Sequence, residues 1–162
     1  WVNLPKKDKQ VKPRYQHIKK NNIPVIKEKE NIEIKVLVGK VKGTKSYIQT
    51  YSPVSIFDLQ FSSPGEIDLN VSIDQMVMVY LIEGELQFSD DDKIATKGQM
   101  IYFNQSSDEM HLTSISNNGS YLVLAGKPLN ELVARYGPFV ANTEDEIQKA
   151  MLNYQTGKMG HL

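Results

Sequence analysis

Short segments in which apolar and polar residues alternate constrain the fold of this 162-residue chain more than any other feature. In the clearest of them, residues 66–73, every second position holds Ile, Leu or Val, and Glu, Asp, Asn or Ser stands between them. Residues 32–38 begin with the same alternation. Because successive side chains of a β-strand point to opposite faces, each such segment predicts a strand with one buried and one solvated face.

Further strand candidates follow at short intervals, separated by glycines or polar clusters. The expected strands are residues 32–38, 46–51, 55–61, 66–73, 76–83, 85–88, 93–96, 99–103, 110–116 and 120–125. Residues 76–82 are apolar apart from the hydroxyl of Tyr80, which predicts a central strand covered on both sides. Asn118 and Gly119, between two strand patterns, predict a β-hairpin. So many short strands indicate an all-β sandwich or barrel.

One short helix is expected near the C-terminal end, over residues 144–154. Thr143 and Glu146 have the spacing of a capping box, and Gly157 is placed to end the helix. An apolar stripe at helical spacing is formed by Ile147, Ala150, Met151 and Tyr154. The preceding segment contains Pro128, Gly137 and Pro138, so it predicts an ordered loop that leads into a docked helix.

These patterns divide the chain into three parts. Residues 1–30 are expected to form an extended inter-domain connector, because three prolines interrupt any helix and the lysine clusters leave little to bury. Residues 31–126 are expected to form the β-barrel, and residues 127–162 the ordered loop and helix. The segment GKVKGTK at residues 39–45 lacks the spacing of a phosphate-binding loop and predicts a β-turn.

Composition narrows the cellular setting. The chain has no Cys, which excludes disulfides and cysteine-based metal or nucleophile chemistry. No apolar run reaches membrane-spanning length and no secretory signal pattern opens the chain, so a cytoplasmic location without membrane contact is expected. Because the first residue is Trp rather than Met, the chain is interpreted as a fragment of a longer protein.

The net charge is zero, but its distribution is uneven. Residues 1–45 hold thirteen Lys or Arg against four Asp or Glu, a balance of +9 that the remaining residues offset. This segment is either a basic arm for an anionic partner or a solvated, lysine-rich surface. Only Arg14 and Arg135 are arginines, the residue that nucleic-acid recognition uses most, so nucleic-acid binding is not expected.

Both ends of the chain resemble the pirin family. The first residues, WVNLP at 1–5 and PRYQ at 13–16, are similar to the family's inter-domain junction. GKPLNE from Gly126, RYGPFV from Arg135 and EDEIQKAMLNYQTGKMG from Glu144 resemble its C-terminal signature, with NELV at 130–133 in place of NEPV. Pirins are bicupins, so the resemblance implies the C-terminal half alone, a cupin jelly-roll with an extended N-terminal connector and one short C-terminal α-helix.

A cupin usually holds its metal with about three His and one carboxylate on adjacent strands. If Gly84 closes the first cupin motif, its carboxylate position is Val77. Its two His positions are Val71 and Ile73, or Asn70 and Ser72. In the second motif, counted from Gly98, the Pro, Gly and His positions fall at Asn104, Ser106 and Glu109. The three His of the chain, His17, His111 and His161, are widely scattered, so neither a metal site nor a catalytic residue is expected.

Glu109 and His111 are the remaining candidates for a pocket. They stand two apart in a strand pattern and would share one face, where a carboxylate could orient an imidazole. One interpretation is a residual acid/base or weak metal pair. The other, which we favour, is a pair of side chains on the solvated face.

Two functions stay open. The resemblance implies a structural or binding half that supports a missing N-terminal cupin, which would carry iron or another divalent transition metal. That N-terminal domain would be its main partner, with a protein partner in transcription and a homodimer of the fragment as further expectations. In the alternative, the barrel cavity binds a small molecule or acts as a quercetin 2,3-dioxygenase. The isolated chain is expected to be no enzyme, whereas the intact parent would be quercetinase-like.

Overall fold

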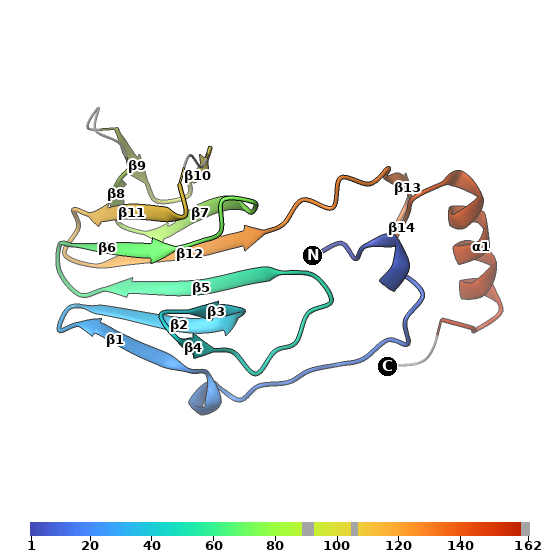
Figure 1. Cartoon of the computed structure of the whole chain (residues 1–162), viewed down its shortest axis with the longest axis horizontal. Coiled ribbons are helices and arrows are strands. Elements are labelled where there is room, and N and C mark those ends of the chain that lie inside the picture. Colours follow the sequence, from blue (N-terminus) through green and yellow to red (C-terminus); the bar gives the residue numbers. More distant parts are fainter. Residues whose placement is uncertain (89–92, 105–106, 160–162) are drawn as a thin grey trace. The chain divides into compact units, whose positions relative to one another are not determined.

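The structure is a computed structural model of the chain, which describes residues 1–88, 93–104 and 107–159. It divides into two compact units, one formed by residues 17–128 and the other by residues 1–16 together with 129–162 (Figure 1). The three-part division at residues 30 and 126 stays a prediction.

The larger unit contains a six-stranded antiparallel sheet. Its strand order is β1-β2-β5-β12-β7-β10. The strands are β1 (Val25–Lys29), β2 (Ile32–Val38), β5 (Val54–Phe61), β12 (Gly119–Gly126), β7 (Met76–Glu83) and β10 (Met100–Phe103). Strand β1 falls in the segment expected only as a connector, where it pairs with β2. A 3-10 turn, η2 (Lys20–Asn22), precedes it.

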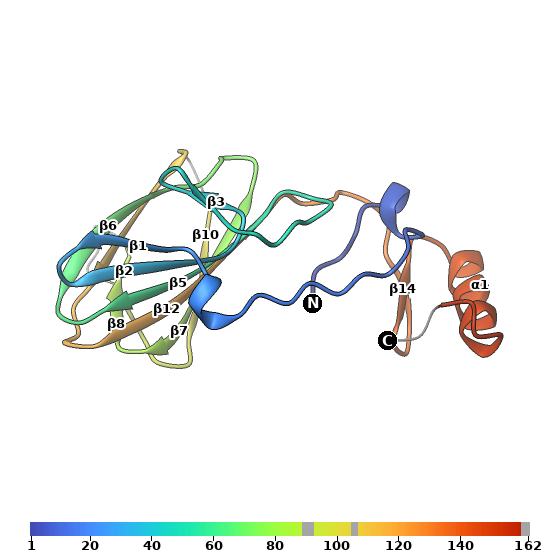
Figure 2. The same cartoon turned by 90° about the horizontal axis from the view of Figure 1, so that it is seen from below.

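A second, four-stranded sheet packs over the first and has the order β6-β11-β8-β9. It consists of β6 (Gly65–Asn70), β11 (Glu109–Ser114), β8 (Glu85–Gln87) and β9 (Ile94–Thr96). A small hairpin, β3 (Lys40–Val41) with β4 (Thr44–Lys45), forms a separate two-stranded sheet. Figures 1 and 2 show the two larger sheets as the layers of a β-sandwich. The predicted all-β class is therefore confirmed.

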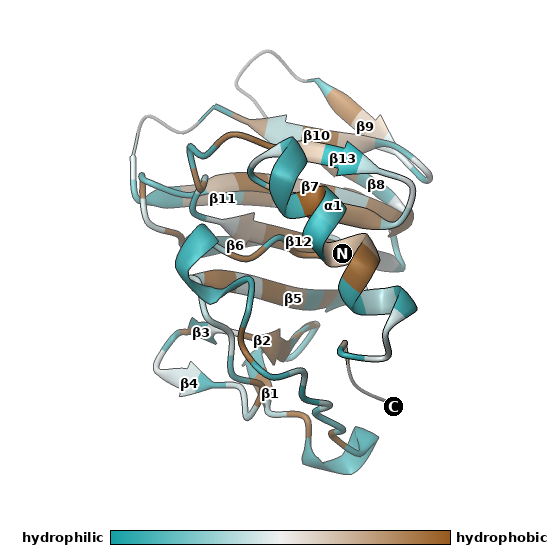
Figure 3. Cartoon of the chain, turned by 90° about the vertical axis from the view of Figure 1, so that its right-hand side faces the viewer, coloured by the Kyte–Doolittle hydropathy of each residue, from teal (hydrophilic) through white to brown (hydrophobic). Residues whose placement is uncertain are grey.

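The core of the sandwich lies between the two sheets and comes from every second residue of their strands. The six-stranded sheet contributes Ile32, Ile34, Val36, Phe57, Leu59, Phe61, Val77, Val79, Leu81, Ile101, Tyr121, Val123 and Ala125. The four-stranded sheet contributes Ile67, Leu69, Leu86, Ala95, Met110 and Leu112. The hydropathy colouring of Figure 3 shows hydrophobic residues along the strands of both sheets. Burying these side chains is the main stabilising contribution to the unit.

A buried polar link also joins the two sheets. The Tyr121 hydroxyl donates to the carbonyl oxygen of Glu85 at 2.8 Å and lies 2.8 Å from Ser114 Oγ. Burial raises the pKa of the Tyr121 phenol above its usual value. The hydrogen bonds offset the cost of placing a hydroxyl in the core.

Most predicted strands are present, and three predictions about them need correction. Residues 46–51 form a loop, held by Ser46 Oγ donating to the Leu37 carbonyl at 2.6 Å. Asn118 and Gly119 do not form a hairpin, because β11 and β12 belong to different sheets. A Cβ on Gly119 would lie 2.5 Å from the Tyr121 hydroxyl oxygen, so glycine is needed there for close approach. Strand β7 is buried on one face only, since its outward residues Met76 and Tyr80 are exposed.

The smaller unit contains the predicted helix, α1 (Glu144–Gln155). Its capping box is present: Thr143 Oγ1 accepts from the Glu146 N–H, and the Glu146 carboxylate accepts from the Thr143 N–H. The expected loop before it contains a short hairpin of β13 (Ala134–Tyr136) and β14 (Phe139–Ala141), and a 3-10 turn, η1 (Lys6–Asp8), lies in the N-terminal segment. None of the helices in the described ranges is long and apolar enough to cross a membrane.

Candidate functional site

The predicted pair Glu109 and His111 lies on β11 and points away from the core. Both side chains are exposed, whereas Met110 and Leu112 between and beyond them are buried. His111 Nδ1 lies 2.6 Å from Asp68 Oδ1 on β6, so the imidazole is oriented by Asp68. The other ring nitrogen, Nε2, lies 3.2 Å from Thr113 Oγ1. The favoured interpretation of the pair, a solvated surface, agrees with this placement, and its use as a pocket stays a prediction.

Among the described residues, the positions that the motif assignment gives to cupin ligands hold side chains that cannot ligate a metal or that face solvent. Val77 and Val71 are buried in the core, and Ile73, Asn70, Ser72 and Asn104 are not. Ser106 and His161 lie outside the described residues. Within the described ranges, no group of three or more His, Cys, Asp or Glu is placed to hold a metal ion. At Val77 and Val71, two positions that the motif assignment gives to ligands, the interior is apolar.

The outer face of the six-stranded sheet carries a surface that the sequence did not predict, which we call the apolar outer face. It is formed by outward-pointing side chains of four adjacent strands: Ile56, Met76, Met78, Tyr80, Met100, Tyr102, Leu122 and Leu124. Strand register makes it continuous, since Leu122 lies opposite Tyr80 and Tyr80 opposite Met100. Met100 and Tyr102 are more than half exposed, at 54% and 59%.

The same outer face of the sheet becomes polar toward β2 and along the rest of β5. There Lys35 lies opposite Asp58, and their Nζ and Oδ2 atoms are 3.3 Å apart. Gln60 Nε2 donates to Ser120 Oγ at 2.8 Å on the neighbouring strand. The apolar outer face therefore has a polar border on the β2 and β5 side, an arrangement typical of a protein interaction surface.

The signal for this surface was present in the sequence. The unbroken apolar run of residues 76–82 correctly indicated a strand with two apolar faces. The prediction that both faces are covered is wrong for the unit itself, because only the face carrying Val77, Val79 and Leu81 meets the second sheet. If the apolar outer face is to be buried, the surface that covers it must come from outside the sandwich.

In the smaller unit, two carboxylates hold the N-terminal segment to the hairpin and helix. The Lys6 N–H donates to Glu131 Oε2 at 2.8 Å, and Asn142 Nδ2 donates to the same oxygen at 3.0 Å. The Asn142 N–H donates to Glu146 Oε2 at 2.8 Å, which lowers the pKa of Glu146, and the nearby Lys6 ammonium lowers it further. Glu131 belongs to the segment 130–133, in which Leu132 is the departure from the family pattern.

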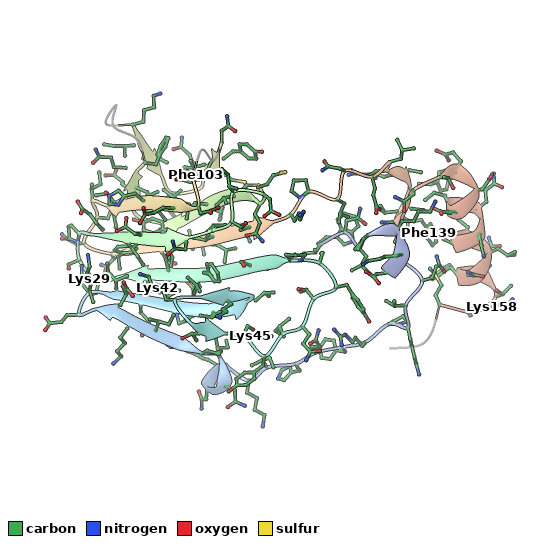
Figure 4. The ribbon with its side chains drawn as sticks, viewed as in Figure 1. Lys29, Lys42, Lys45, Phe103, Phe139 and Lys158 are labelled. Carbon is green, nitrogen blue, oxygen red and sulfur yellow. The ribbon has the colours of Figure 1, made fainter. Side chains whose placement is uncertain are left out.

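This unit also contains a cavity of about 360 Å³. Its lining includes Trp1, Leu4, Phe139, Ala150 and Met159, with Lys6 and Glu146 as charged members. Figure 4 labels Phe139, whose ring packs edge-on against Tyr154 with centroids 5.9 Å apart. Trp1 is 86% exposed although it lines the cavity. The unit thus holds several apolar side chains that it does not bury.

Residues 56–160 match the family described as the Pirin C-terminal cupin domain. The chain belongs to the pirin family. A pirin-like protein of Solanum lycopersicum is 32% identical over 99% of this chain and 55% of its own length. Human pirin is 28% identical over 99% of this chain and 56% of its own length. A putative quercetin 2,3-dioxygenase of Pseudomonas aeruginosa is 29% identical over 98% of this chain and 54% of its own length.

Solved structures also match this chain over about half of their own length. A quercetin 2,3-dioxygenase from Acinetobacter baumannii superposes with a TM-score of 0.86 and 29% identity, covering 99% of this chain and 55% of that one. The chain therefore spans about half the length of the pirin relatives it matches. The rest of each relative is where a second domain of a pirin would lie.

Proposed function

We propose that this chain is the metal-free, partner-binding half of a pirin-like bicupin, and that its apolar outer face packs against the N-terminal cupin domain of the same protein. The apolar outer face is the observation that carries the proposal. Eight apolar or aromatic side chains on neighbouring strands are more than a solvated sheet face needs. The relatives, nearly twice as long as this chain, contain the additional length from which such a partner could come.

The terminal unit supports the same proposal. Its exposed apolar side chains include Trp1, Leu132, Tyr136, Leu152 and Tyr154. Among its described residues, only Ala141, Asn142 and Ile147 are buried, which is too little apolar burial for independent stability. We infer that α1 and the β13–β14 hairpin are docking elements whose apolar side chains are covered by the partner domain.

A metal belongs, on this proposal, to the partner domain. Iron or another divalent transition metal needs imidazole and carboxylate ligands, and would supply redox or Lewis-acid chemistry there. In this chain the carboxylate position holds Val77, which is fully buried among other apolar residues. On this proposal, the interior of the chain stabilises the sandwich and does not supply metal ligands.

Titration calorimetry between this chain and the separately produced N-terminal domain of its parent tests the proposal. Tyr80 lies at the centre of the apolar outer face, between Leu122 and Met100, so Tyr80→Lys should weaken association by about a hundredfold or more, as expected when a charge enters an interface core. Thr113→Lys, on the exposed face of the other sheet, is the matched control and should leave the affinity unchanged. Equal effects of the two substitutions, or no binding by the unmodified chain, would rule the proposal out.

A second candidate function is small-molecule binding or quercetin 2,3-dioxygenase activity in the barrel itself. The names of the Pseudomonas and Acinetobacter relatives favour it. The test is to incubate the chain with quercetin, with and without added Fe²⁺ or Ni²⁺, and follow flavonol absorbance. Turnover that is lost in His111→Ala would establish this function and overturn the metal-free proposal. A protein partner in transcription and a cytoplasmic location stay predictions.

A further inference from the structure

The hairpin β3–β4 places two lysines directly opposite each other. Lys40 pairs with Lys45 in the antiparallel register, and Val41 pairs with Thr44. The turn between the strands is Lys42-Gly43, with φ values of 45° and 81°, as a tight two-residue hairpin turn requires. Val41 is buried, so the opposite face of the hairpin, which carries Lys40 and Lys45, is exposed. Figure 4 labels Lys45 on β4.

Two like charges that face each other across a strand pair repel. Some other lysines of this unit have carboxylate partners: Lys42 Nζ lies 2.6 Å from Glu28 Oε1, and Lys127 Nζ lies 2.7 Å from Asp74 Oδ2. Among the described residues, no carboxylate pairs with Lys40 or Lys45. Asp74 is not available for them, because Lys127 engages it and thereby lowers its pKa. Like charges directly opposite each other on paired strands are destabilising, and an anion bound between the two ammonium groups would relieve that repulsion.

Both lysines also line one depression in the larger unit, with a volume of about 620 Å³. Its other lining residues come from residues 48–55, from Gly39 and from Gln75. None of the lining residues is acidic, and several carry hydroxyl or amide groups, among them Thr50, Tyr51 and Ser55. Gly39 fits closely here, since a Cβ on it would lie 2.6 Å from Ser55 Oγ. The depression therefore combines two unneutralised cations with neutral hydrogen-bonding groups.

We propose that this depression is a binding site for a small anionic molecule that carries phosphate or carboxylate groups, held between Lys40 and Lys45. Each ammonium donates to the oxyanion. The site differs from a phosphate-binding loop, in which backbone amides hold the anion. It is also independent of the apolar outer face, so it goes beyond the proposed partner-binding function.

Isothermal titration calorimetry with inorganic phosphate and with citrate, at constant ionic strength maintained with NaCl, tests the site and separates the two anion chemistries. Lys40→Gln and Lys45→Gln should each weaken binding of the preferred anion by about tenfold or more, the loss expected for one charge-assisted hydrogen bond. Lys20→Gln removes the same charge from the exposed turn η2 and is the matched control, with unchanged affinity expected. Absence of binding by the unmodified chain, or equal losses in all three variants, would overturn the proposal.

A thermal-unfolding measurement gives a second, independent readout. In dilute chloride without other anions, Lys45→Gln should raise the melting temperature of the larger unit, because it removes the repulsion with Lys40, whereas Lys20→Gln should not. The anion bound in the titration should raise the melting temperature of the unmodified chain and have a smaller effect on Lys45→Gln. A lower melting temperature for Lys45→Gln in dilute chloride would show that no repulsion is present and would contradict the proposal.

Discussion

The two outer faces of the sandwich differ in chemistry although the same core lies beneath them. The apolar outer face, on β5, β12, β7 and β10, carries Ile, Met, Tyr and Leu side chains, of which Met76, Tyr80, Met100 and Tyr102 are exposed. The opposite sheet carries what we call the polar outer face: the exposed Glu66, Asp68, Asn70, Glu109 and His111, and the half-buried Gln87 and Thr113. Both faces lie on strands with the same alternation of inward residues. The shared core thus accounts for the fold. The residues on the outward-facing positions determine whether a face is solvated or suited to bind a partner.

The comparison also separates two kinds of predicted site. Glu109 and His111 belong to the polar outer face, where titratable groups pair with neighbours such as Asp68 and remain in water. Apart from the phenols of Tyr80 and Tyr102, the eight residues of the apolar outer face carry no titratable side chain, so this face is suited to burying apolar area against a partner. Catalytic residue types in the sequence therefore point to the polar outer face, although the apolar outer face has the larger apolar area to bury.

The largest effect is expected along β7, where neighbouring residues face opposite ways. Val77 is fully buried in the core, whereas Met76 is 39% exposed on the apolar outer face. Val77→Glu places an unpaired carboxylate in the core and should reduce the free energy of unfolding by about 3 kcal/mol or more. Met76→Glu should change it by less than about 0.5 kcal/mol, as for most surface substitutions. Urea unfolding followed by fluorescence measures both values.

Equal losses for the two variants would mean that Met76 is covered in the isolated chain and that the apolar outer face is not free. Val77→Ala extends the test without a charge. It leaves a cavity only, so its loss should fall between the other two. A Val77→Glu protein as stable as the unmodified chain would show that the interior accepts a carboxylate, which would revive a ligand role for this position.

The next effect concerns self-association of the chain without its partner domain. We expect a homodimer that buries the apolar outer face, because no other part of the chain supplies a comparable apolar sheet surface in the described ranges. Tyr102→Lys should raise the dimer dissociation constant by about tenfold to a hundredfold. Light scattering over a concentration series measures it, with Thr113→Lys on the polar outer face as control. A monomeric mass at high concentration for the unmodified chain would contradict this expectation.

The polar link between the sheets should give a smaller effect with a characteristic pH dependence. Tyr121→Phe removes the hydrogen bond to the Glu85 carbonyl and leaves Ser114 without its partner, which should cost about 1–2 kcal/mol. Burial raises the pKa of Tyr121 in the folded chain. The phenol therefore loses its proton at a lower pH, about 10, in the unfolded chain than in the folded chain. The stabilising contribution is present below that pH and is lost as pH rises through the raised folded pKa. Alkaline unfolding curves should show a smaller loss for Tyr121→Phe.

Much of the fold could be predicted from the alternation of apolar and polar residues. Within residues 66–73, β6 (Gly65–Asn70) shows why, because its alternation indicates both a strand and which face is buried. The predicted strand is too long, since Ile73 lies beyond β6 and is exposed. The capping box at Thr143 was equally predictable, because it depends on contacts within one helical turn. Asn118-Gly119 shows the limit. The glycine is needed for close approach to Tyr121 as the chain passes between sheets, a contact that local turn preferences do not contain.

The candidate surface was harder to predict than the fold. An unbroken apolar run such as residues 76–82 shows that both faces of a strand avoid water, but not whether the second cover belongs to the same chain. The opposition of Lys40 and Lys45 likewise depends on register, which only the turn at Lys42-Gly43 fixes. Both features arise from pairing between strands. The apolar and polar pattern of one strand does not predict which strands lie beside it.

The smallest effect is expected on the polar outer face. Asp68→Asn removes the carboxylate partner of His111, but both side chains are more than half exposed, at 58% and 56%. Surface pairs of this kind contribute between about 0 and 1 kcal/mol, so the free energy of unfolding should change by less than about 0.5 kcal/mol. The dimer dissociation constant should not change, because the substitution lies on the sheet opposite the apolar outer face. Urea unfolding and light scattering provide the two measurements. A large change in either would show that the polar outer face is not simply solvated, and that Asp68 and His111 contribute to a site.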